Sequence, residues 1–216
     1  MDNQLILCPN SSYNSPFKSF GKITSNIKEF MGTPEKFRLV VFTGGEDVDP
    51  SLYGHINCYS ESNFDRDMEE IDIFKMAVKH KIPMAGICRG MQFLNVMAGG
   101  SMYQHIAGHA GSSHTVTTNN GKDIKVNSLH HQLVNINPKV TDVIAWSSSR
   151  ISGVYFGNGG AKQPHPEKEV EAAYFRNINA VGAQWHPELL HEDSEGFTYY
   201  VDLVKDLLTG GKKNNG

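Results

Sequence analysis

The chain has 216 residues, of which 39% are hydrophobic and 20% are charged, and its formal net charge at pH 7 is −3. This length favours one globular domain, which we expect over residues 1–211, followed by a disordered tail at residues 212–216. The lysines and arginines are scattered, so we expect no nucleic-acid partner and no anionic membrane surface. No stretch approaches the roughly 18 apolar residues of a membrane span, and no leader pattern opens the chain. These features predict a cytoplasmic protein that acts on a small molecule.

Three cysteines, Cys8, Cys58 and Cys88, are widely spaced and form no Cys-x-x-Cys pair. An odd number with this spacing argues against a disulfide framework and against a zinc ribbon. We therefore expect at least one free thiol, which leaves room for a reactive cysteine.

In the first half of the chain, short apolar runs at residues 4–7, 38–42 and 82–87 suggest strands, with a helix between the last two at residues 65–80. Such alternation favours a parallel α/β sheet. The helix begins with acids, ends with Lys79 and His80 and stops before a proline. The residues that we place on its apolar face are Ile71, Phe74, Ala77 and Val78.

In the second half, five shorter β-like runs indicate antiparallel additions to the sheet. They lie at residues 114–117, 124–126, 143–146, 170–175 and 180–185. An amphipathic helix at residues 194–208 follows, and Gly210-Gly211 ends it.

Residues 82–98 have the pattern of a buried strand, a very tight turn and a buried helix, and the turn is Gly86-x-Cys88-x-Gly90. Glycines two residues before and after a nucleophile suit a strained elbow, because a Cβ there would collide with the neighbouring strand or helix. A thiol at a helix N-terminus also meets the positive end of the dipole, which favours the thiolate. The pattern points to Cys88 as a nucleophile, although a cysteine in an apolar turn is also a common small core residue.

A cysteine nucleophile needs a base, and the tripeptide His-Pro-Glu occurs twice, beginning at His165 and at His186. His165 lies in a loop of glycine, asparagine, lysine and proline, whereas a strand-like apolar run leads into His186. The proline after His186 keeps the chain extended, and residues i and i+2 of an extended chain point to the same side. Glu188 is therefore predicted to hold one ring nitrogen while the other faces Cys88. We interpret His165 as an exposed loop residue.

Further stretches surround these residues in a fixed order. They are the Gly44-Gly45 loop within residues 42–54, Arg66-Asp67-x-x-Glu70, the elbow with Gln92, Asn95, Gly99-Gly100 and Gln104, then His114-x-Val116, residues 126–132 and residues 184–188. With them the chain resembles the class I glutamine amidotransferase superfamily, and within it the γ-glutamyl-hydrolase-like (γ-glutamyl-γ-aminobutyrate hydrolase-like) branch. The resemblance implies a flavodoxin-like α/β fold, with an open, mostly parallel sheet, flanking helices and antiparallel additions.

The resemblance also implies a chemistry, in which Cys88 attacks the γ-carbonyl carbon of a glutamine-like side chain and leaves a γ-glutamyl thioester for water to hydrolyse. Ammonia or an amine departs, and His186 moves the proton. The remaining site residues that it implies are the backbone N–H groups of Gly45 and Arg89 as an oxyanion hole, and Gln92, Ser128 and His130 as contacts to the glutamyl group. Each also has a purely structural interpretation, as a tight turn, a cap or the closure of a hairpin. Arg66 and Asp67 are interpreted only as a helix start.

Two segments depart from the family pattern. Residues 8–37 are mostly polar, so we expect the sheet to lack a strand at that edge. Residues 147–168 form a glycine-rich loop where the branch has a short turn, which predicts a remodelled leaving-group side of the substrate pocket.

Four functions compete at this point. The favoured one is a freestanding γ-glutamyl amide hydrolase, and the alternative is a glutaminase subunit that delivers ammonia to a separate synthetase partner. A non-enzymatic binding module is disfavoured by the intact Cys, His and Glu set. A metal site built from His105, His109 and His114, or from His130 and His131, matches no common ligand spacing. We therefore expect no metal and no cofactor.

Overall fold

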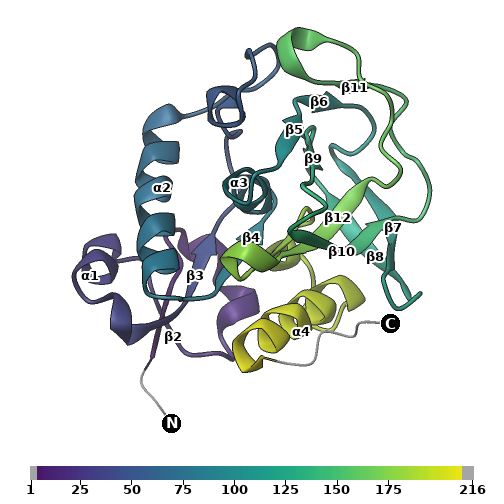
Figure 1. The fold of residues 1–216 in the computed structure, drawn as a ribbon. Coiled ribbons are helices and arrows are strands. Elements are labelled where there is room, and N and C mark those ends of the chain that lie inside the picture. The colour runs from purple at the N-terminus through teal and green to yellow at the C-terminus, as the bar shows by residue number, and fades with distance from the viewer. Residues whose placement is uncertain (1–3, 211–216) are drawn as a thin grey trace.

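A nine-stranded sheet runs through residues 4–210, the part of the chain that the computed structural model describes (Figure 1). Its strands are β1 (Leu5–Leu7), β2 (Lys22–Thr24), β3 (Phe37–Phe42), β4 (Met84–Ile87), β7 (Ser112–Thr118), β8 (Asp123–Ser128), β10 (Thr141–Ser147), β12 (Val170–Phe175) and β13 (Ala180–Ala183). Their order in the sheet is β2-β1-β3-β4-β13-β12-β10-β7-β8. Neighbours from β2 to β13 are parallel and those from β13 to β8 are antiparallel. The predicted mostly parallel α/β sheet with antiparallel additions is confirmed.

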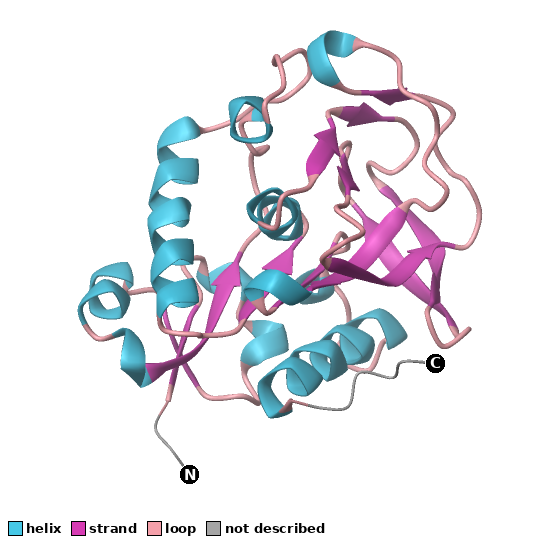
Figure 2. Ribbon diagram, viewed as in Figure 1, coloured by secondary structure: helices cyan, strands magenta, loops and turns pink. Residues whose placement is uncertain are grey.

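Helices cover both faces of this sheet (Figure 2). They are α1 (Ile27–Gly32), α2 (Phe64–Lys79), α3 (Arg89–Met97) and α4 (Glu195–Thr209). Side chains alternate along β3, so that Val40 and Phe42 pack with α1, α2 and α3 on one face. Leu39 and Val41 join the core on the other face, which α4 covers. No helix within residues 4–210 is long and apolar enough to cross a membrane.

The two predicted amphipathic helices form, with ends that capping explains. Asn63 accepts a hydrogen bond from the N–H of Arg66 at the start of α2, and Ser194 accepts one from the N–H of Phe197 at the start of α4. Gly210 ends α4 in the left-handed conformation with φ 63°. The predicted tail at residues 212–216, and residue 211, lie outside the described residues.

The predicted apolar face of α2 is partly wrong. Val78 is 43% exposed, whereas Asp67 and Glu70 are buried on the same side as Ile73 and Ala77. The hydrophobic pattern alone could not show this, because the two acids find a buried partner on another helix, as described below.

The expectation that the sheet lacks a strand beyond β1 is also wrong. The three residues of β2 pair in parallel with β1. This strand contains a single apolar residue, Ile23, and its side chains are at most half-buried, so it leaves no apolar run in the sequence. Residues 180–185 likewise contain a shorter strand than predicted, because β13 ends at Ala183.

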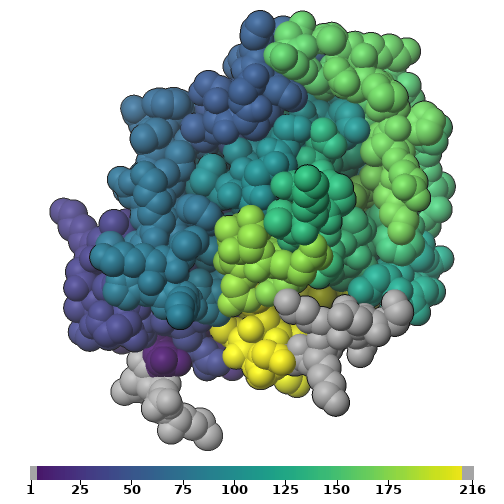
Figure 3. Space-filling view, in the orientation of Figure 1, coloured from purple at the N-terminus to yellow at the C-terminus, as the bar shows by residue number. Residues whose placement is uncertain are grey.

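Two small sheets stand beside the large one. One pairs β5 (Ser101–Tyr103) with β9 (Leu133–Asn135), and the other pairs β6 (His105–Ile106) with β11 (Tyr155–Phe156). β11 lies within the predicted loop at residues 147–168. Figure 3 shows this segment in green over the outer surface, where Asn158 accepts a hydrogen bond from the N–H of Ile56 at 2.7 Å. The loop at residues 147–168 is therefore hydrogen-bonded to the segment that follows β3.

Candidate active site

Three adjacent parallel strands, β3, β4 and β13, end at the same edge of the sheet, where ligands bind in open α/β folds. Gly44 and Gly45 follow β3, Cys88 follows β4, and His186 follows β13. The topology thus brings together residues that are far apart in the sequence.

Cys88 lies at a strained elbow between β4 and α3, with φ 52° and ψ −111°. A Cβ on Gly86 would lie 2.6 Å from the backbone carbon of Gly90, and a Cβ on Gly90 would lie 2.0 Å from the carbonyl oxygen of Phe42. Both glycines are therefore required for close packing, as the sequence predicts. A non-glycine residue at positive φ costs on the order of 1–3 kcal/mol and is typical of functional sites.

The predicted base lies beside the predicted nucleophile. His186 Nδ1 is 2.6 Å from Glu188 Oε1, and the imidazole also shares a hydrogen bond with the Cys88 side chain. Burial would lower the pKa of His186, but the bonds to Cys88 and Glu188 outweigh it and raise that pKa to about 10. The ring is therefore held as an imidazolium, the partner that a thiolate needs. His165 is exposed, as expected.

Asn127 positions His186, a role that the sequence does not predict. Its side-chain amide donates to the carbonyl oxygen of His186 at 2.9 Å and accepts from the N–H of His186 at 2.8 Å. This two-way bond ties the end of β8 to the chain after β13. An asparagine at a strand end carries no periodic signal, so the sequence alone could not reveal the contact.

Arg66, interpreted from the sequence as a helix start only, holds the Gly44-Gly45 loop. Its guanidinium donates to the carbonyl oxygens of Thr43 at 3.2 Å and Gly44 at 2.9 Å. Because a trans peptide points its N–H away from its C=O, this bond directs the Gly45 N–H away from Arg66. Gly45 has φ 132°, and a Cβ on it would lie 2.3 Å from Arg66 Nη1.

Asp67 and Glu70 of α2 both form ion pairs with the buried Arg89 of α3. The Arg89 residue is 1% exposed. Its backbone N–H is at the first position of a helix, where no intrahelical acceptor exists. The ion pairs thus fix the helix end that carries one of the two predicted oxyanion donors.

A cavity of about 190 Å³ lies at the edge of these strands. Such a volume is below the roughly 300–1,000 Å³ of pockets for drug-sized ligands, so it suits a small one. Its lining residues are Gly45, Glu46, Asp47, Glu61, Cys88, Arg89, Gln92, Leu129, His130 and His131. Five predicted site residues are thus together. Ser128 does not line this cavity, being fully buried at the end of β8, and its contact to a substrate stays a prediction.

Comparisons with known proteins agree with this fold. Residues 23–153 match the Peptidase C26 family, a span that includes Cys88 and ends before His186. The predicted glutamine amidotransferase-like protein YvdE of Lactococcus lactis is 29% identical over 191 residues, which are 78% of this chain and 72% of that protein. The carbamoyl phosphate synthase small chain of Helicobacter pylori is 30% identical over 142 residues, covering 64% of this chain and 34% of that protein.

Among solved structures, a glutamine amidotransferase from Thermotoga maritima superposes with a TM-score of 0.57 at 17% sequence identity, covering 97% of this chain and 85% of that chain. Fold and matches together define a protein of the class I glutamine amidotransferase superfamily. Within that superfamily the chain belongs to the Peptidase C26 family. The predicted resemblance is confirmed at this level.

Proposed function

We propose that this protein hydrolyses a γ-glutamyl amide bond, in glutamine or a γ-glutamyl amine or conjugate, through a thioester on Cys88. The observation that carries the proposal is the continuous contact from Cys88 to His186 to Glu188, with Cys88 lining the cavity. A nucleophile, a base and a group that orients the base are the parts that acyl transfer requires.

In the first half of the proposed reaction, the Cys88 thiolate attacks the γ-carbonyl carbon and the carbonyl oxygen becomes an oxyanion. The N–H groups of Gly45 and Arg89 would donate to that oxygen. The imidazolium of His186 then gives its proton to the nitrogen, the C–N bond breaks, and ammonia or an amine leaves. The product is glutamate bound as a thioester.

In the second half, neutral His186 accepts a proton from water, which attacks the thioester carbon. The C–S bond breaks, and glutamate leaves. The Glu188 carboxylate stabilises the imidazolium each time it forms. No cofactor enters either half.

The cavity wall supports a glutamyl group as the bound part of the substrate. Three acids, Glu46, Asp47 and Glu61, line the cavity and would favour the α-ammonium of a glutamyl group. Gln92, also at the wall, would donate a hydrogen bond to its carboxylate, and His130 lines the same wall. The remodelled loop at residues 147–168 would select the leaving group.

The experiment measures glutamate release from glutamine and from a panel of γ-glutamyl amines and peptides, with no other protein present. Cys88→Ala is compared with Cys58→Ala, which removes the exposed thiol as a matched control. Turnover that Cys88→Ala abolishes and Cys58→Ala retains supports the proposal. Equal turnover in both variants, or activity that a chelator removes and a thiol-alkylating reagent does not, overturns it.

A second candidate is a glutaminase subunit that passes ammonia to a separate synthetase. It is supported by the similarity to a carbamoyl phosphate synthase small chain. Negligible turnover of the isolated chain on the whole panel, together with Cys88-dependent glutamine hydrolysis when a synthetase captured from the source cells is added, would favour this candidate over the freestanding hydrolase.

A further inference from the structure

A second group of chemically active side chains is buried under the antiparallel half of the sheet, outside the proposed catalytic triad. This histidine cluster consists of His109, His114, His130, Glu169 and Glu171. The side chains of His109 and Glu171 are 0% exposed, and those of His130, Glu169 and His114 are 1%, 3% and 10% exposed. Burying five ionisable groups together costs free energy unless the groups are paired or bind an ion.

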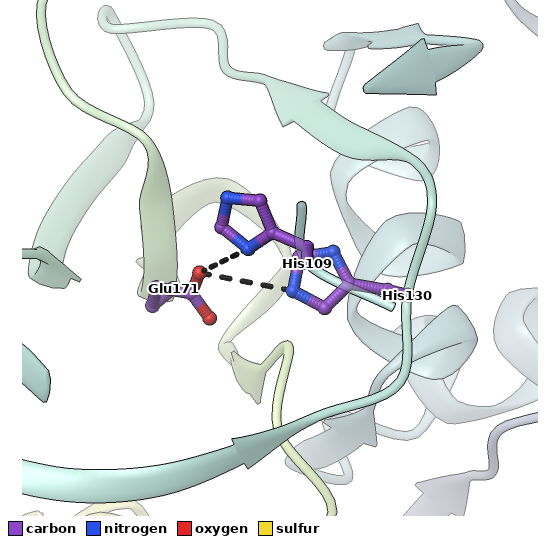
Figure 4. A group of neighbouring side chains, drawn as sticks. All are labelled: His109, His130 and Glu171. Atoms are coloured by element: carbon purple, nitrogen blue, oxygen red, sulfur yellow. Dashed lines mark ion pairs between the residues drawn. The ribbon is translucent and has the colours of Figure 1, made fainter. Parts of the chain in front are cut away.

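Glu171 is the centre of the histidine cluster. Its Oε1 lies 3.3 Å from His109 Nδ1 and 3.7 Å from His130 Nε2. Each of the three residues offers one possible ligand atom, and these three atoms lie within 4.8 Å of one another. Figure 4 shows both rings directing a nitrogen toward the Glu171 carboxylate.

The 3.3 Å separation is close to that between two ligands of one ion, and the 3.7 Å separation is longer than a direct hydrogen bond. Bonds of about 2.0–2.1 Å to a tetrahedral Zn²⁺ place two ligand atoms about 3.3–3.4 Å apart. Neither His109 Nδ1 nor His130 Nε2 has a hydrogen-bond partner among the described residues, and neither does Glu171 Oε2. Unpartnered polar atoms at this depth indicate that something polar belongs between them.

The far side of each imidazole faces an oxygen of the protein. His130 Nδ1 is 2.8 Å from the carbonyl oxygen of Gln132, so Nδ1 carries the proton and donates it. His109 Nε2 faces Glu169 Oε2 at 3.4 Å, without the geometry of a hydrogen bond. Histidines that bind metals commonly give their second N–H to a carbonyl or a carboxylate in this way, which leaves the first nitrogen's lone pair free.

Charge balance points in the same direction. The carboxylates of Glu169 and Glu171 are buried and require positive charge nearby. A bound dication would supply that charge.

We propose that His109, His130 and Glu171 bind one divalent transition-metal ion of the Zn²⁺ class. Glu169 and His114 support this site from outside, the latter at 3.1 Å from Glu171 Oε1. Spacing along the chain could not reveal the site, because its three ligands come from separate segments. His105 and His131, which the sequence also offered, are not part of it.

The ion would also stabilise the substrate cavity. His130 lines that cavity, and Glu169 accepts hydrogen bonds at 2.9 Å from the N–H groups of Ile151 and Ser152 in the remodelled loop. A bound ion would therefore hold one wall of the cavity and the base of the loop in one position. Its role would be structural, since no reacting atom touches it.

The test uses the full chain with Cys58→Ala and Cys88→Ala, so that neither of these thiols can bind the metal. The chelator-treated protein is dialysed against Zn²⁺ alone near neutral pH, and bound zinc is counted per chain. We expect one ion per chain. Zinc K-edge X-ray absorption on the same sample should show imidazole and oxygen ligands with no sulfur.

Substitutions then locate the ion. In the same background, Glu171→Gln should weaken zinc binding by at least about 100-fold, since even supporting residues contribute about 10–100-fold. His191→Gln, at an exposed histidine, is the matched control and should leave the affinity unchanged. Absence of bound zinc, sulfur ligation, or equal affinity in Glu171→Gln would overturn the proposal. If Glu171→Gln does not fold, the count and the absorption spectrum decide alone.

Discussion

Arg66 donates a hydrogen bond to the carbonyl oxygen of Gly44 at 2.9 Å, so the first turn of α2 sets the orientation of the Gly44-Gly45 peptide. The same guanidinium donates through Nε to Glu70 at 3.1 Å, and Glu70 also forms an ion pair with Arg89. The two predicted oxyanion donors, on Gly45 and Arg89, are thus held by one buried charge network. That network gives α2 a role in positioning the site.

Replacing Arg66 with Met should lower kcat by about tenfold or more while changing KM little, because a misdirected donor loses part of the 10²–10³-fold that one oxyanion donor contributes. Steady-state kinetics on the best γ-glutamyl substrate measures this. Arg38→Met is the control, since Arg38 also donates to a carbonyl oxygen, that of Phe20, far from the site. Equal kcat values in the two variants would show that Arg66 does not position the loop.

Glu188→Gln should shift the basic limb of the kcat/KM profile to lower pH. The Glu188 carboxylate favours the charged imidazole and helps to raise the pKa of His186 to about 10. Removing that charge lowers the pKa, so the imidazolium that protonates the leaving group is lost earlier as pH rises. Glu192→Gln, at an exposed acid nearby, should leave the profile unchanged. An unshifted basic limb in Glu188→Gln would contradict the assigned role.

Much of this site was predictable because its residues stand at positions with strong local signals. The glycines around Cys88 and the proline after His186 restrict the backbone, and each restriction can be read in one sequence. Arg66, Asp67 and Asn127 act through contacts between segments far apart in the chain, which leave no periodic pattern.

The elbow makes a prediction about stability. Gly90→Ala places a methyl group 2.0 Å from the carbonyl oxygen of Phe42, a backbone atom that cannot move aside. Overpacking of this kind costs about 3 kcal/mol or more. Gly32→Ala is the control, because a Cβ there meets nothing within 4 Å, and as a residue of α1 it should gain up to about 1 kcal/mol of stability. Urea unfolding of both variants measures the difference, and equal midpoints would contradict the tight elbow.

The buried ion pairs between α2 and Arg89 also make a prediction about stability. Arg89→Met leaves the carboxylates of Asp67 and Glu70 buried without their cation, which should cost about 3–5 kcal/mol. Adding Asp67→Asn and Glu70→Gln removes the uncompensated charges and should recover part of that loss. Arg176→Met breaks an exposed pair with Asp142 and should cost less than about 1 kcal/mol. Thermal unfolding distinguishes these outcomes, and similar losses for Arg89→Met and Arg176→Met would count against the network.

The thioester on Cys88 is the central claim, and intact-protein mass spectrometry after rapid acid quench tests it most directly. Wild-type protein mixed with an active γ-glutamyl amide should gain the mass of one γ-glutamyl group, located on the peptide that contains Cys88 and released by hydroxylamine. Cys58→Ala should gain the same mass, and Cys88→Ala should gain none. Substrate turnover with no adduct on Cys88, or with an adduct on another residue, would contradict the mechanism.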